Sequence, residues 1–315
     1  MSAGRTVESE SLRVLTVGNM YPPHHRGGYE LVWESAVAHL EAQGHTVRVL
    51  TTDHREPQPP ADAFDHAARE LHWYWHEDAW PDLSPLERLR LERHNRRILC
   101  REIADLRPDV VCWWAMGGMS LSMIETVRRL GVAEAFVLCD DWLVYGPRVD
   151  GWMRALDRIG PLRRVIELAT RVPAQIRRAR PGPSLCPSRW LLGRAHAAGW
   201  DFTESTVVGQ GVPRSLFPEA PPRPWRWKIA CVGRLDERKG VDLAIGALAY
   251  LPEEARLTII GSAGDEAYRT ELDRLIETTG VGDRVEFTSL PRDELGDAYA
   301  DADVVVFPVR WPEPW

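Results

Sequence analysis

The sequence has few cysteines, and none of them is spaced for a disulfide framework or a zinc site. No C-x-x-C pair occurs among them. Four of the five lie in apolar, strand-like runs, so we expect buried free thiols in a reducing compartment. The five are Cys100, Cys112, Cys139, Cys186 and Cys231.

Long apolar runs and an excess of positive charge are also missing. No run is long enough to cross a bilayer, and residues 1–10 are polar and lack the apolar core of a secretion signal. The formal net charge of −7 argues against a general nucleic-acid binder, which needs a positive footprint. We therefore expect a cytoplasmic protein with no nucleic-acid partner.

The composition is that of an ordinary soluble protein, with 44% hydrophobic and 27% charged residues. A chain of 315 residues is long enough for two domains of ordinary size. Fourteen tryptophans are many for this length, but they are scattered and form no repeat.

Strand-like and helical patterns alternate through the first two thirds of the chain. The apolar run 12–17 is followed by a loop with Gly27 and Gly28, a helix from about Tyr29 to Gly44, and a strand at 45–51. Further strands are expected at 110–114, 135–139, 184–187 and 206–208, and helices at 86–106, 118–130 and 189–198. This alternation predicts a doubly wound parallel sheet, with the polar stretch 55–85 as an excursion from it.

A proline-rich stretch divides the chain. Five prolines fall between Val212 and Pro224, a density that supports neither a helix nor a central strand. We predict a first domain at 1–212, a linker at 213–225 and a second domain at 226–315, where the alternation restarts. Two Rossmann-like domains would face each other across a cleft, and ligands bind in such clefts outside the carboxyl ends of the strands.

The segment 231–240, CVGRLDERKG, is the most informative part of the second domain. It joins a strand at 228–232 to a helix that Gly240 opens. Unpaired backbone N–H groups and the helix dipole favour an anion there, and Arg234 and Lys239 would suit a diphosphate. The alternative is that both cations simply solvate a loop beside Asp236 and Glu237.

Together these segments resemble the retaining glycosyltransferases of family 4, which have the GT-B fold, along nearly the whole chain. The first domain contributes LRVLTVG, YPPHHRGGYE and GHTVRVLTT, and the second VGRLDERKGVDLAI, LTIIGSAG and ADVVVFP followed by EP. The resemblance implies transfer of a sugar from a nucleotide-diphosphate sugar to an acceptor hydroxyl, with retention at the anomeric carbon and no required metal or other cofactor. It leaves the acceptor open: a saccharide, a lipid-linked molecule or a small molecule.

The resemblance also assigns residues to the donor. Arg234 and Lys239 would hold the donor diphosphate and stabilise the charge that grows on the leaving nucleotide. Glu313 would orient the donor sugar, and Gly233 belongs to the same glycine-framed turn. Leu290 would contact the base through its backbone.

Four further glycines would lie close to a ligand. Gly27 and Gly28 match a loop that approaches the donor or acceptor, since glycine has no side chain to obstruct it; the alternative is an ordinary turn before a helix. Gly261 and Gly264 flank a turn near the nucleotide, although a plain strand-to-helix turn explains them as well.

The chain departs from the family at Cys139, where a histidine is expected. A thiol is a weaker hydrogen-bonding partner for a sugar hydroxyl than an imidazole. Asp140 or Asp141 would carry the polar contact instead, and we take Asp140 as the candidate. The alternative for each aspartate is a cap on the following helix or turn.

An arginine-rich stretch at 152–180 is the second departure, with eight arginines against Asp157 and Glu167. It predicts weak peripheral contact between a helix at 160–180 and an anionic membrane, at the inner face, or a lipid-phosphate acceptor. The same stretch also fits a core-packed helix with a solvated basic face, and we favour that interpretation. Its inward positions would be Leu162, Val165, Ile166, Ala169, Val172 and Ile176, opposite Arg164, Arg171 and Arg178.

The third departure is at the end of the chain. The family has a second glutamate eight positions after the first, and the sequence ends two residues after Glu313. We therefore expect a truncated second domain whose last strand, 304–307, exposes an apolar edge. Two further hypotheses follow: a catalytically incomplete nucleotide-binding remnant or scaffold, and, more weakly, a nucleotide-sugar epimerase on the same fold.

Overall fold

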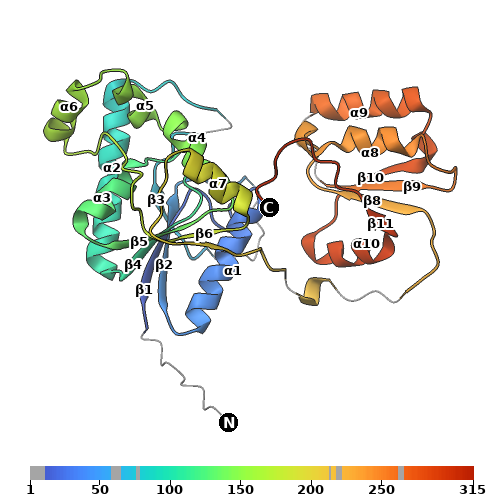
Figure 1. Ribbon diagram of the computed structural model, residues 1–315, viewed down its shortest axis with the longest axis horizontal. Helices are drawn as coiled ribbons and strands as arrows, with labels where there is room; N and C mark the ends of the chain where they lie inside the picture. Colours follow the sequence, from blue (N-terminus) through green and yellow to red (C-terminus); the bar gives the residue numbers. More distant parts are fainter. Residues whose placement is uncertain (1–10, 58–64, 76–78, 213, 218–221, 262–265) are drawn as a thin grey trace, which may run out of the picture. The chain divides into compact units, whose positions relative to one another are not determined.

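The computed structural model describes residues 11–57, 65–75, 79–212, 214–217, 222–261 and 266–315 (Figure 1). The chain forms two compact units: Met1–Gln210 together with Pro314–Trp315, and Gly211–Glu313. The linker expected at 213–225 stays a prediction, because Pro213 and residues 218–221 lie outside the described part.

The first unit is built on a parallel sheet. Its described strands follow the order β3-β2-β1-β4-β5-β6-β7, so the chain winds outward in both directions from β1 and β4, as in a doubly wound fold. The strands are β1 (Arg13–Val17), β2 (Thr46–Thr52), β3 (Ala68–Leu71), β4 (Val110–Trp113), β5 (Ala133–Val137), β6 (Ser184–Cys186) and β7 (Ser205–Val207).

Helices pack on both faces of this sheet. Trp33 and Val37 of α1 belong to one buried cluster, whereas Leu99 of α2 and Val127 of α3 belong to another. The helices are α1 (Gly28–Ala42), α2 (Pro85–Leu106), α3 (Ser122–Leu130), α4 (Trp142–Val149), α5 (Gly151–Asp157), α6 (Leu162–Thr170) and α7 (Arg189–Ala197). Most boundaries agree with the sequence pattern, because the caps are local: Ser84 and Glu87 form a reciprocal capping box at the start of α2.

The stretch 55–85 is not wholly outside the sheet as predicted, since it contributes the edge strand β3. The strand pairs in parallel with β2. The sequence does not show the alternation of apolar and polar residues typical of a strand, because the charged Arg69 occupies a buried position in β3. That guanidinium is compensated by Asp65 at 2.6 Å and by the carbonyls of Tyr21 and Pro22.

The favoured interpretation of residues 160–180, a core-packed helix, is wrong. Helix α6 ends at Thr170, where Arg171 adopts a left-handed conformation with φ 59°, and Pro173 follows. No residue of α6 is buried, and Leu162 and Val165 are exposed. Val172 and Ile176 are buried as expected, but from the irregular chain beyond the helix.

The second unit is a smaller α/β layer structure. Its described strands are parallel in the order β10-β9-β8-β11, and α8 and α9 pack against each other. The elements are β8 (Lys228–Val232), α8 (Val241–Leu248), β9 (Arg256–Ile260), α9 (Glu266–Thr279), β10 (Val285–Thr288), α10 (Leu295–Asp301) and β11 (Val304–Val305), with 3-10 turns η1 (Arg214–Leu216), η2 (Glu237–Lys239), η3 (Gly282–Arg284) and η4 (Arg292–Glu294). On the edge strand β11, Val304 and Val305 are 39% and 42% exposed.

Candidate functional site

Three of the predicted donor residues lie at one edge of the second sheet. Gly233, Gly261 and Leu290 follow β8, β9 and β10, and parallel strands bring these carboxyl ends together. A Cβ on Gly261 would lie 1.9 Å from the carbonyl oxygen of Gly233, so tight backbone packing by itself requires glycine there. Gly264 lies outside the described residues.

The turn after β8 is held by its own carboxylate. Asp236 accepts a hydrogen bond from the backbone N–H of Arg238 at 3.0 Å and caps η2. Gly240 ends this turn with φ 67°, and a Cβ on it would lie 2.0 Å from the carbonyl oxygen of Pro308. The turn therefore packs closely against the segment 308–313, which leads to Glu313.

Glu313 and Lys239, distant in sequence, form an ion pair. Lys239 Nζ donates to Glu313 Oε1, and the same oxygen accepts from Trp311 Nε1 at 2.9 Å. The Lys239 and Glu313 side chains are 26% and 12% exposed. The structure thus places two of the residues predicted to be catalytic in direct contact.

Arg234 has a more open environment. Its side chain is 56% exposed, and Asp236 lies 3.5 Å from its guanidinium. Asp236 is shared with Arg238, whose hydrogen bonds lower the pKa of that carboxyl to about 2. Since Asp236 stays ionised and is largely engaged by Arg238, the Arg234 guanidinium is the less strongly paired of these two exposed cations.

Sequence reasoning missed the contacts that fix the segment 308–313. Arg310 donates to Asp242 of α8 through its side chain and to the carbonyl of Arg238 through its backbone N–H at 2.9 Å. Tyr268 of α9 donates to the other oxygen of Asp242 at 2.9 Å. Arg310 was visible in the sequence, but its partners Arg238 and Asp242 lie about 70 residues earlier.

Gly27 and Gly28 start α1 of the first unit. Gly27 is its N-cap, without a side-chain cap, and both glycines are exposed. No atom lies within 4 Å of a Cβ built on Gly28, so the fold itself does not demand glycine at that position. This open surface fits the predicted approach of a ligand, which stays a prediction.

Glu30 is a candidate that the sequence reasoning missed. It is 5% exposed, burial raises its pKa, and its Oε2 is buried with no hydrogen-bond partner among the described residues. A Cβ on Gly27 would lie 3.3 Å from that oxygen. A buried carboxylate with spare hydrogen-bonding capacity beside an exposed glycine loop is suited to a hydroxyl donor.

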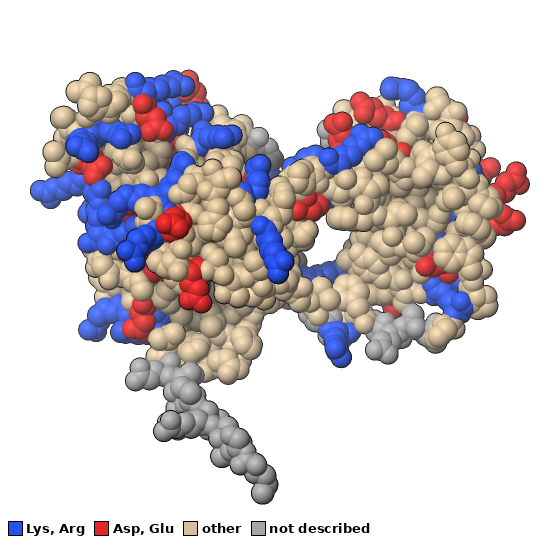
Figure 2. Space-filling view, viewed as in Figure 1, with Lys and Arg blue, Asp and Glu red and all other residues tan. Residues whose placement is uncertain are grey.

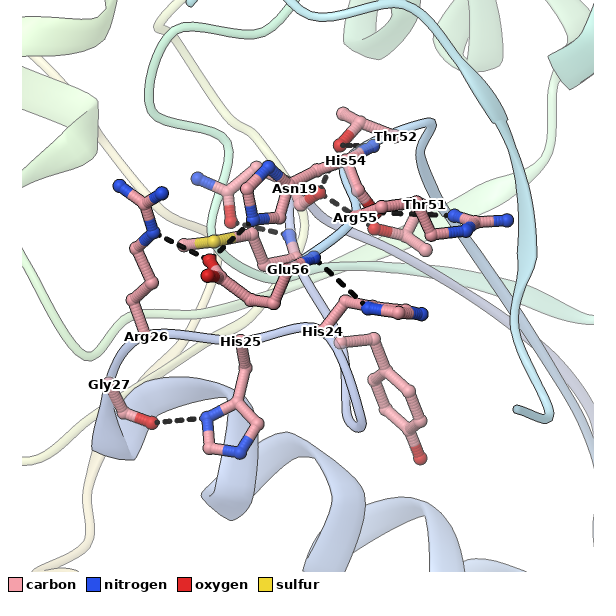
Figure 3. A network of polar contacts seen from close by, with 12 residues as sticks. Asn19, His24, His25, Arg26, Gly27, Thr51, Thr52, His54, Arg55 and Glu56 are labelled. Carbon is pink, nitrogen blue, oxygen red and sulfur yellow. Dashed lines mark hydrogen bonds and ion pairs between the residues drawn. The ribbon is translucent and has the colours of Figure 1, made fainter. Parts of the chain in front are cut away.

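A polar network joins the loops that follow β1 and β2 (Figure 3). Glu56 Oε1 accepts from Arg26 Nε at 2.6 Å and contacts His54 Nε2 at 2.8 Å, while its backbone N–H donates to His24 Nδ1 at 3.1 Å. Partial burial opposes ionisation of Glu56, but the hydrogen bonds from Arg26 and His54 lower its pKa overall. The Arg26 guanidinium also lies 5.0 Å from the centre of the Trp75 ring. The network stabilises the loop before Gly27.

Asp140 lies just beyond β5, at the carboxyl edge of the first sheet. It accepts from the backbone N–H of Trp142 at 3.2 Å and from the hydroxyl of Tyr145 at 2.8 Å. Burial raises the pKa of Asp140 to about 6. The contact with Trp142 supports the capping alternative, and the contact with Tyr145 adds a second anchor that the sequence did not suggest.

The two neighbouring residues, Cys139 and Asp141, each have a hydrogen-bond partner of their own. Cys139 is buried, burial raises its pKa to about 12, and its Sγ accepts from Gln210 Nε2 at 3.4 Å. Asp141 accepts from Arg194 at 2.6 Å. A neutral thiol and a paired carboxylate leave Asp140 as the better acceptor for a ligand hydroxyl.

Two features are absent from the described residues. No group of three or more His, Cys, Asp or Glu side chains in that part of the chain is arranged to hold a metal ion. No helix there combines the length and the apolar character that a membrane span requires. Metal-independent transfer stays a prediction.

The two Rossmann-like units define the GT-B glycosyltransferase fold. Sucrose-phosphate synthase from Thermosynechococcus elongatus matches with a TM-score of 0.63 at 17% identity, covering 96% of this chain and 77% of that one. The Anabaena protein Alr3699/HepE, solved in complex with UDP-glucose, matches with a TM-score of 0.56 at 17% identity, covering 96% and 76%. At such identities the likeness establishes the fold alone.

Sequence comparison adds a family for the second unit: residues 216–315 match the family described as Glycosyl transferases group 1. D-inositol 3-phosphate glycosyltransferase of Xylanimonas cellulosilytica is 42% identical over 82 residues, which are 25% of this chain and 20% of that protein. GDP-mannose-dependent alpha-(1-6)-phosphatidylinositol monomannoside mannosyltransferase of Mycobacterium tuberculosis is 26% identical over 95% of this chain and 73% of its own length. The chain thus matches only about a fifth of the first relative's length.

Proposed function

We propose that this protein is a retaining glycosyltransferase of family 4, which transfers a hexose from a nucleotide-diphosphate sugar to an acceptor hydroxyl. The arrangement that carries the proposal is the glycine-framed turn after β8, with Arg234 exposed and Lys239 paired to Glu313. The group 1 match over 216–315 covers this whole arrangement and supports it.

In the proposed donor site the diphosphate contacts the turn between β8 and α8. Arg234 supplies a planar fork, the positive end of the α8 dipole lies at the same turn, and Lys239 supplies a point charge. These groups stabilise the negative charge that develops on the leaving diphosphate without a metal ion. Glu313, shared with Lys239 and Trp311, accepts hydrogen bonds from hydroxyls of the donor sugar. Leu290 contacts the base through its backbone, beside the turns at Gly233 and Gly261.

In the first unit the proposed acceptor site lies at the carboxyl edge of the sheet. Asp140, oriented by Tyr145, accepts a hydrogen bond from the acceptor, and Gly27 and Gly28 leave room for it. With retention, the acceptor hydroxyl attacks the face from which the diphosphate leaves. The matched relatives act on an inositol phosphate and on a phosphatidylinositol mannoside, so we propose a phosphorylated or lipid-linked polyol or saccharide as acceptor.

The test is donor turnover in variants of the turn. We expect Arg234→Ala and Lys239→Ala each to lower transfer or donor hydrolysis by ~100-fold or more, measured across a panel of UDP-, GDP- and ADP-sugars. The matched control is Arg274→Ala, an exposed arginine on α9, which should retain full activity. Unchanged turnover in both turn variants would contradict the assignment.

The alternative is a nucleotide-binding protein that does not transfer sugar. One observation favours it: Lys239 is already neutralised by Glu313, which leaves less positive charge for a diphosphate. Calorimetric titration with nucleoside diphosphates distinguishes the two, because binding without any turnover of the sugar panel supports the alternative.

A further inference from the structure

Helix α6 presents an apolar stripe to solvent. Leu162, Val165 and Leu168 are 61%, 60% and 81% exposed. Because successive residues of a helix are about 100° apart, these three lie on one contiguous face. Ile166, one turn after Leu162 at the edge of this stripe, packs partly buried against a cluster that includes Trp152. The helix is therefore held to the first unit along one edge of the stripe, while Leu162, Val165 and Leu168 have no cover from the described residues.

Helix α6 and the segments before and after it in the chain carry unpaired positive charge. Arg154, Arg158, Arg164, Arg171 and Arg180 are exposed, and no carboxylate of a described residue lies within ion-pair distance of any of them. Arg164 lies one helical turn before Leu168, at the edge of the stripe. Figure 2 shows Lys and Arg side chains gathered over the part of the first unit formed by α3, α5 and α6. This concentration stands out in a chain whose net charge is −7.

Two surface cavities open beside α6, and both are lined by arginines. The larger, about 580 Å³, is lined by Arg129, Arg163, Arg164 and Arg177 together with Glu125 and Glu167. The second, about 480 Å³, shares Arg163 and Arg177 and adds Arg178, with Asp157 as its carboxylate. Arg129, Arg163 and Arg177 are paired with Glu167, Asp157 and Glu125, and Arg164 and Arg178 have no carboxylate partner among the described residues. These last two suit phosphate-bearing headgroups.

We propose that the first unit docks on an anionic lipid bilayer through α6. Leu162, Val165 and Leu168 enter the boundary between headgroups and acyl chains, and the surrounding arginines contact lipid phosphates. Short amphipathic helices bind in this way, because apolar insertion and charge attraction reinforce each other. The proposal concerns a surface outside the donor and acceptor sites and does not depend on sugar transfer.

A second copy of this chain is a poorer occupant for the same surface. Two copies meeting through α6 would bring arginines against arginines, a repulsion that opposes association. A stripe of three side chains is also small beside the ~800 Å² per partner of a stable protein interface. Charge complementarity therefore favours a negatively charged lipid surface.

The experiment is flotation of the full chain with vesicles. We expect binding to vesicles containing phosphatidylglycerol, weak or no binding to pure phosphatidylcholine, and a decline with increasing salt. Leu162→Ser, Val165→Ser and Leu168→Ser combined should weaken binding at least tenfold, and Arg158→Gln or Arg164→Gln by ~5-fold each. Tyr250→Ser, which removes a side chain that is 91% exposed in the second unit, and Arg274→Gln are the matched controls and should bind as the parent does.

The outcomes separate this proposal from its competitors. Equal vesicle binding by the triple serine variant and the parent would overturn it, as would a dimer in sedimentation equilibrium that the same substitutions dissociate. The triple variant should unfold like the parent, since its three positions are exposed. Donor hydrolysis by the triple serine variant should equal that of the parent. Loss of vesicle binding with intact hydrolysis therefore supports docking. Absence of hydrolysis in every variant, the parent included, would contradict only the proposed function.

Discussion

At the scale of single residues, Tyr145 decides how Asp140 is presented. Its hydroxyl donates to Asp140 Oδ2 at 2.8 Å, while burial raises the pKa of that carboxyl to about 6. The hydrogen bond favours the ionised form and so opposes the effect of burial. Tyr145 therefore acts as a positioning residue for the proposed acceptor contact.

We predict that Tyr145→Phe shifts the pH dependence of transfer without abolishing it. Loss of the hydrogen bond raises the pKa of Asp140 further, so the acidic limb of the kcat/KM profile should move up from about 6 by roughly one unit. Activity at pH 8 should remain close to that of the parent. A uniform loss at every pH would indicate that Tyr145 has only a structural role.

At the scale of elements, the segment 308–313 depends on a glycine in the turn before α8. A methyl group at Gly240 would collide with the backbone of Pro308, and φ 67° is unfavourable for a residue with a side chain. The turn and the segment that carries Glu313 therefore constrain each other.

Gly240→Ala at the N-cap of α8 and Gly246→Ala inside α8 form a matched pair of variants. Gly240→Ala should destabilise the second unit by ~2 kcal/mol or more and disrupt the pair of Lys239 and Glu313. Gly246→Ala, where a Cβ meets nothing within 4 Å, should stabilise the helix by up to ~1 kcal/mol. Urea unfolding and donor turnover of both variants provide the measurement. Equal stability of the two would show that the contact with Pro308 is not restrictive.

At the scale of the whole molecule, the first unit contains a buried pair of carboxyl groups where α2, α3 and α5 meet. Glu92 accepts from Tyr74 at 2.7 Å and also from Ser120 and Ser122. Asp150 accepts three backbone N–H groups, and burial, followed by the nearby charge of Glu92, raises its pKa to about 8. The native state thus holds protons that the unfolded chain releases near pH 4.

Stability should therefore fall as the pH rises. The pKa of Asp150 is raised in the folded state. Its protonated carboxyl therefore contributes fully to the free energy of unfolding below about pH 4, and this contribution is lost as the pH rises to about 8. We expect the free energy of unfolding in urea, followed by tryptophan fluorescence, to be at least ~1 kcal/mol lower at pH 8 than at pH 5. In Asp150→Asn this difference should shrink, and an unchanged difference would assign the pH dependence to other groups.

Much of the fold could be predicted because its signals are local. Apolar runs of strand length, the capping box at Ser84 and the glycines after β8 and β9 lie within a few residues of the elements they define. Strand β3 was missed because Arg69 is neutralised by Asp65 and by carbonyls of the loop after β1, and no local pattern reveals such a partner.

For the candidate site, the order of elements and the placing of Gly233, Arg234 and Gly261 directly after strands, with Lys239 just before α8, follow from the sequence alone, because glycine placement and hydrophobic periodicity act over short distances. The pairing of Lys239 with Glu313, 74 residues away, and the hydrogen bond from Tyr145 to Asp140 depend on the folded structure. The outward position of the leucines of α6 depends on it too, since burial is set by which surfaces meet after folding. Ion pairs and burial join residues that are distant in the chain, and no local pattern specifies them.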